Sequence, residues 1–283
     1  MKPTKEQLQQ RYGEALERSL EAFSRLDEKE WAKKASDHWT AKEHLAYLVS
    51  GAEEELLVAT RQQLAGEPMK IPGFETREDA VEFNKRGIAK VVGLPASDLL
   101  SRLKSAIEEH ISMIDSPTEA DLDKPAMNPN WDRPGTIRDL FAAGYGFLAQ
   151  QYQQIRRVAK KKVPHWVDAG PPERVHFHMN YLFHYMPLIL WGKRAEDMNA
   201  TYLFTMEGPG GGQWSMRIAN GRADTEEAAA DPHDIEIKTK PEHWMDLSSG
   251  DLSAPIAIMT RKVKISGNGG LAMKLSGLFG TEE

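Results

Sequence analysis

Few side chains in this chain could do chemistry, and histidine is the first to consider. His176, His178 and His184 fall on one segment rich in large apolar residues. On a helix, residues two apart point about 200° apart around the axis, so His176 and His178 cannot chelate one ion together. The chain has no cysteine, which excludes a thiolate nucleophile, a disulfide framework and a zinc site built from sulfur. We therefore interpret these histidines as packed or exposed single residues.

Two glycine-rich stretches are the next candidates, because such loops can hold phosphates. Gly208–Gly212 lacks a following Gly-Lys-Ser/Thr and leads into a predicted strand, so it indicates a hairpin loop. Ser266–Gly270 could hold an anion on backbone N–H groups before a helix, but a strand-to-helix connection is the preferred interpretation. The chain has no nucleophile elbow, no His-Glu-x-x-His motif and no distinct carboxylate pair. The sequence therefore predicts no catalytic residue and no cofactor.

Composition limits the partners. A chain of 283 residues is long enough for two domains, each with its own core. With 36 Lys and Arg against 42 Asp and Glu, the net charge is −6, so no positive surplus is available to hold a phosphate backbone. The N-terminus lacks the apolar core of a secretory signal, and the apolar run 181–191 is shorter than the ~20 residues of a membrane span. We expect a cytoplasmic protein without a nucleic-acid partner or an integral membrane segment.

The first half of the chain has the pattern of amphipathic helices. A Thr40–Glu43 capping box begins one of them, which should run to about residue 63. Stripes at spacings of three and four mark the other stretches, and all their members except Gln151 are apolar or small: Leu8, Tyr12, Leu16, Leu20 and Phe23; Leu99, Leu103, Ile107, Ile111 and Ile114; and Leu140, Gly144, Phe147, Gln151, Ile155 and Val158. Four such helices with facing stripes predict a bundle.

The second half alternates apolar and polar residues in the manner of strands. Trp214, Met216 and Ile218 fall on one face of a predicted strand with polar residues on the other, and the alternation recurs over 235–238. Asn220-Gly221 supplies the positive φ angles of a tight hairpin turn. This pattern predicts a sheet with one polar face and one apolar face, which short apolar helices cover.

In order and spacing, the second half resembles the sterol carrier protein 2 (SCP2) domain, a lipid-binding fold. The matching motifs are Tyr202-Leu203-Phe204, the glycine loop, Trp214 to Ile218, Asn220-Gly221, Asp234 to Ile237, Trp244 with Leu247, Gly250, Ile265-Ser266-Gly267 and Leu271 to Phe279. The resemblance implies an apolar space between sheet and helices that holds a fatty acyl chain, a sterol or a similar lipid. Its expected lining is Phe204, Trp214, Met216, Ile218, Ile235, Ile237, Trp244, Met259, Ile265, Leu275 and Phe279. On pattern alone, the same side chains indicate a packed core.

The first half resembles another family, the DinB-like four-helix bundle, which includes thiol-dependent enzymes such as mycothiol-dependent maleylpyruvate isomerase. The resemblance rests on Trp39-Thr40, the helix Leu45 to Leu57, Phe83-Asn84, Trp131 and Thr136 to Ile155. Enzymes of this family typically hold a divalent metal with three histidines, and the corresponding positions here are Tyr47, Phe147 and Gln151. Phe147 has no donor atom, Gln151 is a weak neutral ligand, and Tyr47 would have to lose a proton with a pKa near ~10. We therefore predict that the metal site is lost.

His44, one helical turn before Tyr47, is the remaining candidate ligand, since residues three apart share a helix face. One histidine does not make a metal site. The functional interpretation of Tyr47, His44 and Gln151 is a residual polar pocket. The alternative is a hydrogen-bonded patch in the core, because a buried glutamine must find a partner and a tyrosine hydroxyl or histidine nitrogen would serve.

Together these patterns predict an α+β protein: a DinB-like four-helix bundle over 1–163, a linker over 164–172, and an SCP2-like antiparallel sheet covered by helices over 173–283. The preferred function is binding or carriage of an apolar small molecule or lipid, without catalysis and without a metal. One alternative is a thiol-dependent isomerase or transferase related to maleylpyruvate isomerase. Another is an interaction scaffold without a small ligand, and a homodimer through 181–191 would be one form of it.

Overall fold

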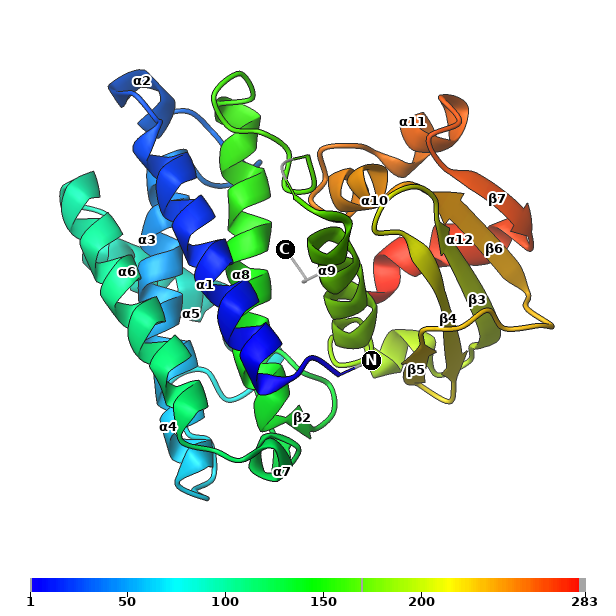
Figure 1. Cartoon of the computed structure of the whole chain (residues 1–283), viewed down its shortest axis with the longest axis horizontal. Helices are drawn as coiled ribbons and strands as arrows, with labels where there is room; N and C mark the ends of the chain where they lie inside the picture. The colour runs from blue at the N-terminus through cyan, green and yellow to red at the C-terminus, as the bar shows by residue number, and fades with distance from the viewer. Residues whose placement is uncertain (1, 169, 280–283) are drawn as a thin grey trace. The chain divides into compact units, whose positions relative to one another are not determined.

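A computed structural model describes residues 2–168 and 170–279, which form two compact units (Figure 1). Pro3–His165 is a helical unit, and a unit with a five-stranded sheet begins at Trp166. The division falls where the composition changes to a segment rich in lysine, proline and glycine. In the described part of the chain, no helix has both the length and the apolar character needed to cross a membrane.

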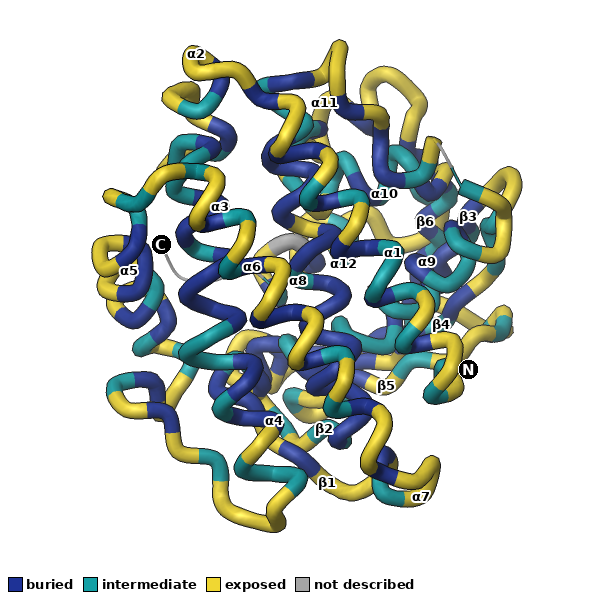
Figure 2. The backbone as a smooth tube through the Cα atoms, turned by 60° about the vertical axis from the view of Figure 1, so that its left-hand side comes forward, coloured by how far each residue is buried: buried dark blue, intermediate teal, exposed yellow. Residues whose placement is uncertain are grey.

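Four long helical stretches build the first unit, and this confirms the predicted bundle. They are α1 (Lys5–Ser24), α3 (Ala41–Gly51) continuing through the π-helical η1 (Ala52–Leu56) into α4 (Leu57–Leu64), α6 (Ala96–Ser112), and α8 (Ile137–Val158). Helices α1 and α3 each contact both α6 and α8. Buried residues recur along the helices at the spacing of an inward-facing stripe (Figure 2).

Threonine N-caps fix where three of these helices begin. Thr4, Thr40 and Thr136 each accept a hydrogen bond from the backbone N–H three residues later, and the side chain at that later position returns a bond to the cap. These capping boxes satisfy two of the N–H groups that a helix start leaves without partners. The capping box expected at Thr40 and Glu43 is confirmed.

Shorter elements close the bundle: α2 (Glu28–Trp31), η2 (Arg77–Asp79), α5 (Ala80–Val91), η3 (Met113–Asp115), α7 (Glu119–Leu122), β1 (Pro125–Ala126) and β2 (Gly135–Thr136). The sequence analysis did not anticipate α5 as a helix, although Phe83 lies on it. The rings of Phe83 and Phe74 stack with their centroids 4.7 Å apart, and α5 contacts α3.

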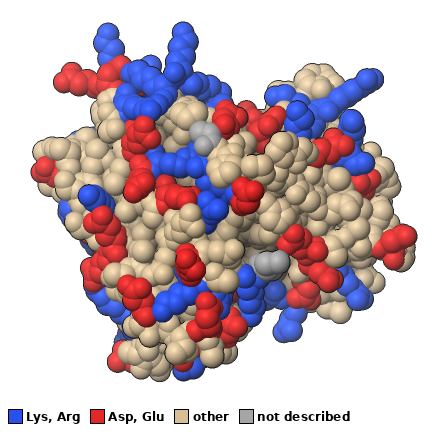
Figure 3. All heavy atoms as spheres, viewed as in Figure 1, with Lys and Arg blue, Asp and Glu red and all other residues tan. Residues whose placement is uncertain are grey.

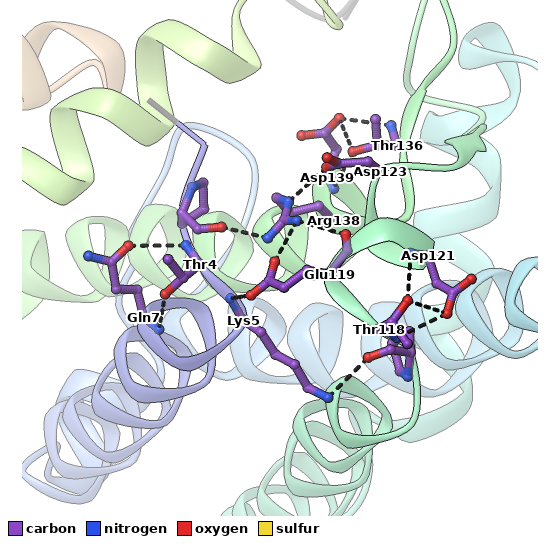
Figure 4. Close-up of polar contacts among 12 residues, drawn as sticks. Thr4, Lys5, Gln7, Thr118, Glu119, Asp121, Asp123, Thr136, Arg138 and Asp139 are labelled. Atoms are coloured by element: carbon purple, nitrogen blue, oxygen red, sulfur yellow. Dashed lines mark hydrogen bonds and ion pairs between the residues drawn. The ribbon is translucent and has the colours of Figure 1, made fainter.

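A buried arginine ties one end of the bundle together (Figure 4). Arg138, in the first turn of α8, donates to the carbonyl oxygen of Pro3 at 2.6 Å, to Oε2 of Glu119 at 2.8 Å and to Oδ1 of Asp123 at 3.2 Å. The other carboxylate oxygen of Glu119 accepts from the backbone N–H of Lys5 at 2.8 Å. Because its charge is paired twice, we assign Arg138 a structural role.

The second unit contains the sheet. Its strands are β3 (Asn199–Met206), β4 (Gly212–Ala219), β5 (Arg222–Glu226), β6 (Ile235–Thr239) and β7 (Lys264–Gly267), in the order β5-β4-β3-β6-β7. All neighbours are antiparallel except β3 and β6, which are parallel. The predicted sheet is therefore confirmed with one parallel pair, because the chain crosses back past β4 and β5 to reach the free edge of β3.

The helices of this unit are α9 (Pro172–Tyr185), α10 (Pro241–Ser248), α11 (Ala254–Met259) and α12 (Gly269–Leu275), with the short turns η4 (Gly192–Ala195) and η5 (Ser276–Leu278). Helix α9 carries the three histidines but includes only the first part of the apolar run 181–191. It ends at Tyr185, and Met186 caps it with helical φ and ψ angles, because the following Pro187 has no backbone N–H to continue the helical hydrogen bonds.

Turn predictions hold in the sheet. Asn220 and Gly221 have φ values of 52° and 73° between β4 and β5, as a tight hairpin requires. Gly208–Gly212 joins β3 to β4, and Ser266–Gly270 leads from β7 into α12. Neither glycine-rich stretch precedes a long helix.

Candidate functional site

The first candidate site is a buried polar cluster in the bundle. His44 on α3 faces Gln151 on α8, with Nδ1 of the imidazole 2.5 Å from Oε1 of the glutamine. Since that amide oxygen can only accept, Nδ1 carries the proton and Nε2 is left as an acceptor. Nε2 lies 3.0 Å from the hydroxyl of Ser36, which therefore donates to it. Both ring nitrogens are thus occupied, and this leaves no lone pair on His44 for a metal.

Aromatic rings fill the adjoining space. The rings of Tyr47 and Phe147 meet edge to face with their centroids 4.9 Å apart, and Trp39 lies 4.8 Å from Tyr47 by the same measure. A Cβ built on Gly51 would approach Cζ of Phe147 to 2.8 Å, so the phenyl ring uses the room that a side chain at Gly51 would need. Of the three positions that the sequence resemblance assigns to metal ligands, Tyr47 and Phe147 are thus in ring contact and Gln151 is held by His44. A phenyl ring offers no donor atom, and a neutral amide is a weak ligand for a divalent metal.

Burial opposes a charge on this cluster. Burial lowers the pKa of His44 to about 4, although the hydrogen bond with Gln151 acts in the opposite direction and raises it. A neutral imidazole at physiological pH agrees with the hydrogen-bond assignment, in which Nε2 accepts. Of the two interpretations drawn from the sequence, this geometry favours the hydrogen-bonded patch.

A second buried histidine lies deeper in the bundle, and the sequence analysis did not single it out. His110 on α6 has Nδ1 3.0 Å from the hydroxyl of Tyr12 on α1 and Nε2 2.8 Å from Oγ1 of Thr60 on α4. Burial lowers the pKa of His110 to about 3 and raises that of the Tyr12 hydroxyl above its usual range. The trio joins three helices through a neutral imidazole.

A half-buried carboxyl group, that of Glu55, is also held by polar side chains. Oε1 of Glu55, in the π-helical η1, accepts from the side-chain amides of Asn128 at 3.0 Å and Asn130 at 3.1 Å. Burial raises the pKa of Glu55, while the two amide hydrogen bonds lower it. The residues described contain no group of three or more His, Asp or Glu side chains placed to hold one metal ion. Glu55 therefore anchors the 128–130 loop.

The second candidate site is the apolar face of the sheet. In the ladder, Phe204 pairs with Trp214 on β4 and with Ile237 on β6, so these predicted lining residues share a face. The ladder puts further members of the predicted set on that face: Met216, Ile218, Ile235 and Ile265. All of them except Ile265 are buried.

Helices α9 and α10 cover this face with aromatic rings. Phe183 on α9 stacks on Trp214 with centroids 4.8 Å apart and contacts Phe204 at 4.9 Å. Trp244 on α10 lies 5.8 Å from Phe183 and 5.3 Å from Phe204, and it stays half-buried. Nε1 of Trp214 donates to Oδ1 of Asn180 at 2.7 Å. This cluster fills the centre of the space that the sequence assigned to a ligand.

The sequence analysis did not include Phe183 or Asn180 in the lining. The apolar character of α9 was evident, but its register on the sheet was not. Leu275 is buried and Phe279 is half-buried near the end of the chain. Met259 differs from the expectation, because its side chain is 77% exposed on α11 instead of lying among the others.

The polar face of the sheet carries a groove of about 660 Å³. It is lined by Thr201, Ser215, Arg217 and Asp224 from the strands and by the 229–232 segment. This lining is too polar to bury a long apolar chain.

The histidines of α9 remain separate, as predicted: Nε2 of His176 pairs with Glu227 at 2.9 Å, whereas His178 is buried near Trp166.

Comparisons with known proteins match the helical unit and the sheet-containing unit to two different families. Residues 11–155 match the DinB superfamily and residues 192–280 match the SCP-2 sterol transfer family. The solved structure of mycothiol-dependent maleylpyruvate isomerase is similar to 88% of this chain over 90% of its own length, with 10% identity and a TM-score of 0.56. The sterol carrier protein domain 2 of Helicoverpa armigera covers 39% of this chain and 90% of its own, with 25% identity and a TM-score of 0.33.

An uncharacterised protein from Clostridium difficile 630 covers 56% of this chain and 96% of its own, with 22% identity and a TM-score of 0.48. No curated protein matches the chain by sequence. At 10% identity, the likeness to the isomerase shows the fold alone. The match over 11–155 spans more than half of the 283 residues, and the match over 192–280 covers all five strands of the sheet. The chain therefore belongs to the DinB superfamily and carries a C-terminal domain of the SCP-2 sterol transfer type.

Proposed function

We propose that the chain is an intracellular carrier that binds an apolar ligand, a fatty acyl chain or a sterol-like molecule, in its SCP2-type domain. The observation that supports the proposal most is the continuous apolar face of β3, β4 and β6, which α9 and α10 cover, in the segment that matches the SCP-2 family. An acyl chain on this face would gain about 0.8 kcal/mol for each CH₂ group removed from water. No catalytic group is needed for carriage.

The aromatic cluster determines how a ligand enters. Trp214, Phe204 and Phe183 are fully buried, whereas Trp244 is half-buried on the short helix α10. Trp244 touches Phe183 and Phe204 by ring contacts alone in the described structure, so its displacement breaks no side-chain hydrogen bond among the described residues. In the proposed binding step, the indole of Trp244 swings outward and the ligand takes its place against Phe183 and Phe204.

Titration of the full chain with a fluorescent fatty acid tests this step. Met216→Asp should abolish uptake, because it puts a charge on the apolar face, whereas Ser215→Asp on the polar face should be tolerated. Trp244→Ala should bind more tightly than the wild type, because it removes the side chain that competes with the ligand. If neither the wild type nor Trp244→Ala binds a fatty acid, acyl-CoA, sterol or isoprenoid probe at high micromolar concentration, the carrier proposal fails.

We also infer that the bundle holds no transition metal at the position where DinB-type enzymes bind one. Both ring nitrogens of His44 are in hydrogen bonds, one with Gln151 and one with Ser36. One of the expected ligand positions is Phe147, whose ring packs on Tyr47 and has no donor atom. Elemental analysis of the purified chain should find no stoichiometric zinc, nickel or iron. One transition metal per chain, lost in His44→Ala, would contradict this inference and favour an isomerase or transferase.

A further inference from the structure

Large apolar side chains are exposed mainly in one segment of this protein. Of the six that are exposed among the described residues, four lie between Ile256 and Met273. Three of them are on α11, where Ile256 is 49% exposed, Ile258 46% and Met259 77%. This short helix rests on the domain through Ala257, which is fully buried, and leaves most of its surface in solvent. Such a patch is typical of a surface that meets another molecule or a membrane.

The charge of the same segment is unlike that of the whole chain. The chain carries a net charge of −6, but residues 252–279 contain Arg261, Lys262, Lys264 and Lys274 and no acidic residue. Three of these follow α11 directly and are exposed. None of the three side chains makes an ion pair with a residue that the structure describes. Figure 3 shows lysine and arginine side chains gathered on the part of the surface that bears α11.

The backbone at Arg261 is a further indication. Its φ is +58°, in the left-handed region that glycine adopts without strain and arginine does not. The turn from α11 into β7 would be easier to form with glycine there. The arginine side chain is therefore not explained by the needs of the turn, and it adds a positive charge beside the exposed apolar helix.

We propose that α11 and the basic residues that follow it dock the protein onto an anionic lipid bilayer. Ile256, Ile258 and Met259 would enter the boundary between headgroups and acyl chains, while Arg261, Lys262 and Lys264 pair with lipid phosphates. The combination of apolar and basic side chains favours a lipid bilayer as the partner. An acidic protein surface would match the basic side chains but not the apolar ones, and a neutral apolar surface would match the apolar side chains but not the basic ones. The proposal goes beyond ligand carriage, since docking requires no ligand in the apolar face.

Co-sedimentation of the full chain with vesicles tests the docking. The wild type should bind vesicles of equal parts phosphatidylcholine and phosphatidylglycerol, less so at high salt, and should bind phosphatidylcholine vesicles weakly. Lys262→Glu/Lys264→Glu should weaken partitioning by about 25-fold or more, because the loss of each positive charge costs about fivefold. Lys160→Glu/Lys161→Glu makes the same charge change at exposed lysines outside this segment and should have little effect.

The apolar contribution has its own matched pair. Ile256→Asp/Met259→Asp should abolish vesicle binding, whereas Val81→Asp, at a residue that is 37% exposed in the bundle, should not. Arg261→Gly should weaken binding about fivefold while keeping or raising the melting temperature, because it relieves the backbone as it removes the charge. Fatty acid titrations of these variants without vesicles should match the wild type, so failure of docking and failure of carriage are separable.

Three results would overturn the proposal. The first is a wild type that does not sediment with anionic vesicles. The second is an equal loss of binding in the test and control variants, which would show only an effect of net charge. The third is a wild type that forms a concentration-dependent dimer and does not bind vesicles, if Ile256→Asp dissociates that dimer. A second copy of the chain, and not a bilayer, would then cover α11.

Discussion

The two units of this protein fill their interiors differently. The bundle buries polar groups in matched sets, His44 with Gln151 and His110 with Tyr12 and Thr60. The SCP2-type domain buries a cluster of aromatic rings around Phe183. A matched polar set holds one geometry, since each group that loses its partner costs about 1–3 kcal/mol. Apolar rings can repack around a guest at lower cost. We therefore expect a fixed interior in the bundle and an adaptable one in the SCP2-type domain.

The largest expected effect comes from removing the centre of the aromatic cluster. Phe183→Ala should destabilise the SCP2-type domain by about 4 kcal/mol, because it deletes a fully buried ring and leaves a cavity. Calorimetry should show a lower melting temperature for that domain and an unchanged transition for the bundle. Tyr181→Ala, which shortens a half-buried side chain on the same helix, should cost less. Equal shifts in both transitions would show that the two units unfold as one.

A smaller effect should follow acidification of the bundle. Burial holds the pKa of His44 at about 4 and that of His110 at about 3, below the ordinary 6.5. Between these values and pH 6.5, the unfolded chain binds protons that the folded histidines do not. Stability from the two groups is thus complete above pH 6.5 and falls as the pH drops. At pH 5, each histidine should cost the bundle about 2 kcal/mol.

Urea unfolding of the bundle at pH 7 and pH 5 measures this loss. His110→Gln should reduce the difference between the two pH values, because glutamine keeps hydrogen-bonding atoms but does not titrate. A bundle of equal stability at both pH values would show that the imidazoles are solvated. The bundle interior would then not be a fixed set of buried polar groups, and it would not differ in this respect from the interior of the SCP2-type domain.

Local features of both units could be predicted from the sequence, whereas partners in space could not. The cap at Thr40 and the turn at Asn220 depend on residues three positions apart or fewer, and the structure shows both. The contact of His44 with Gln151 joins residues 107 positions apart, so it depends on how α3 and α8 align. Met259 follows the same apolar pattern as buried methionines. Its exposure arises because α11 is short and rests on Ala257 alone.

The smallest effect concerns how tightly the bundle interior is fitted. A Cβ on Gly144 of α8 would lie 2.1 Å from the hydroxyl oxygen of Tyr12 and 2.6 Å from its Cζ. Gly144→Ala should therefore push α1 and α8 apart or turn Tyr12 away from His110, at a cost of about 1–3 kcal/mol. The neighbouring Gly13→Ala offers a control, because its Cβ would meet nothing within 4 Å.

Gly13→Ala should stabilise α1 by up to about 1 kcal/mol, since alanine has the higher helix propensity. Opposite signs for the two substitutions in chemical denaturation would show that the space beside Tyr12, and not glycine content in general, sets the stability. If Gly144→Ala were tolerated, α1 and α8 could separate at little cost. The bundle would then be able to adapt to a guest as the SCP2-type domain is proposed to do, and the choice between the two units as ligand carriers would have to be made by titrating each variant with the acyl probe.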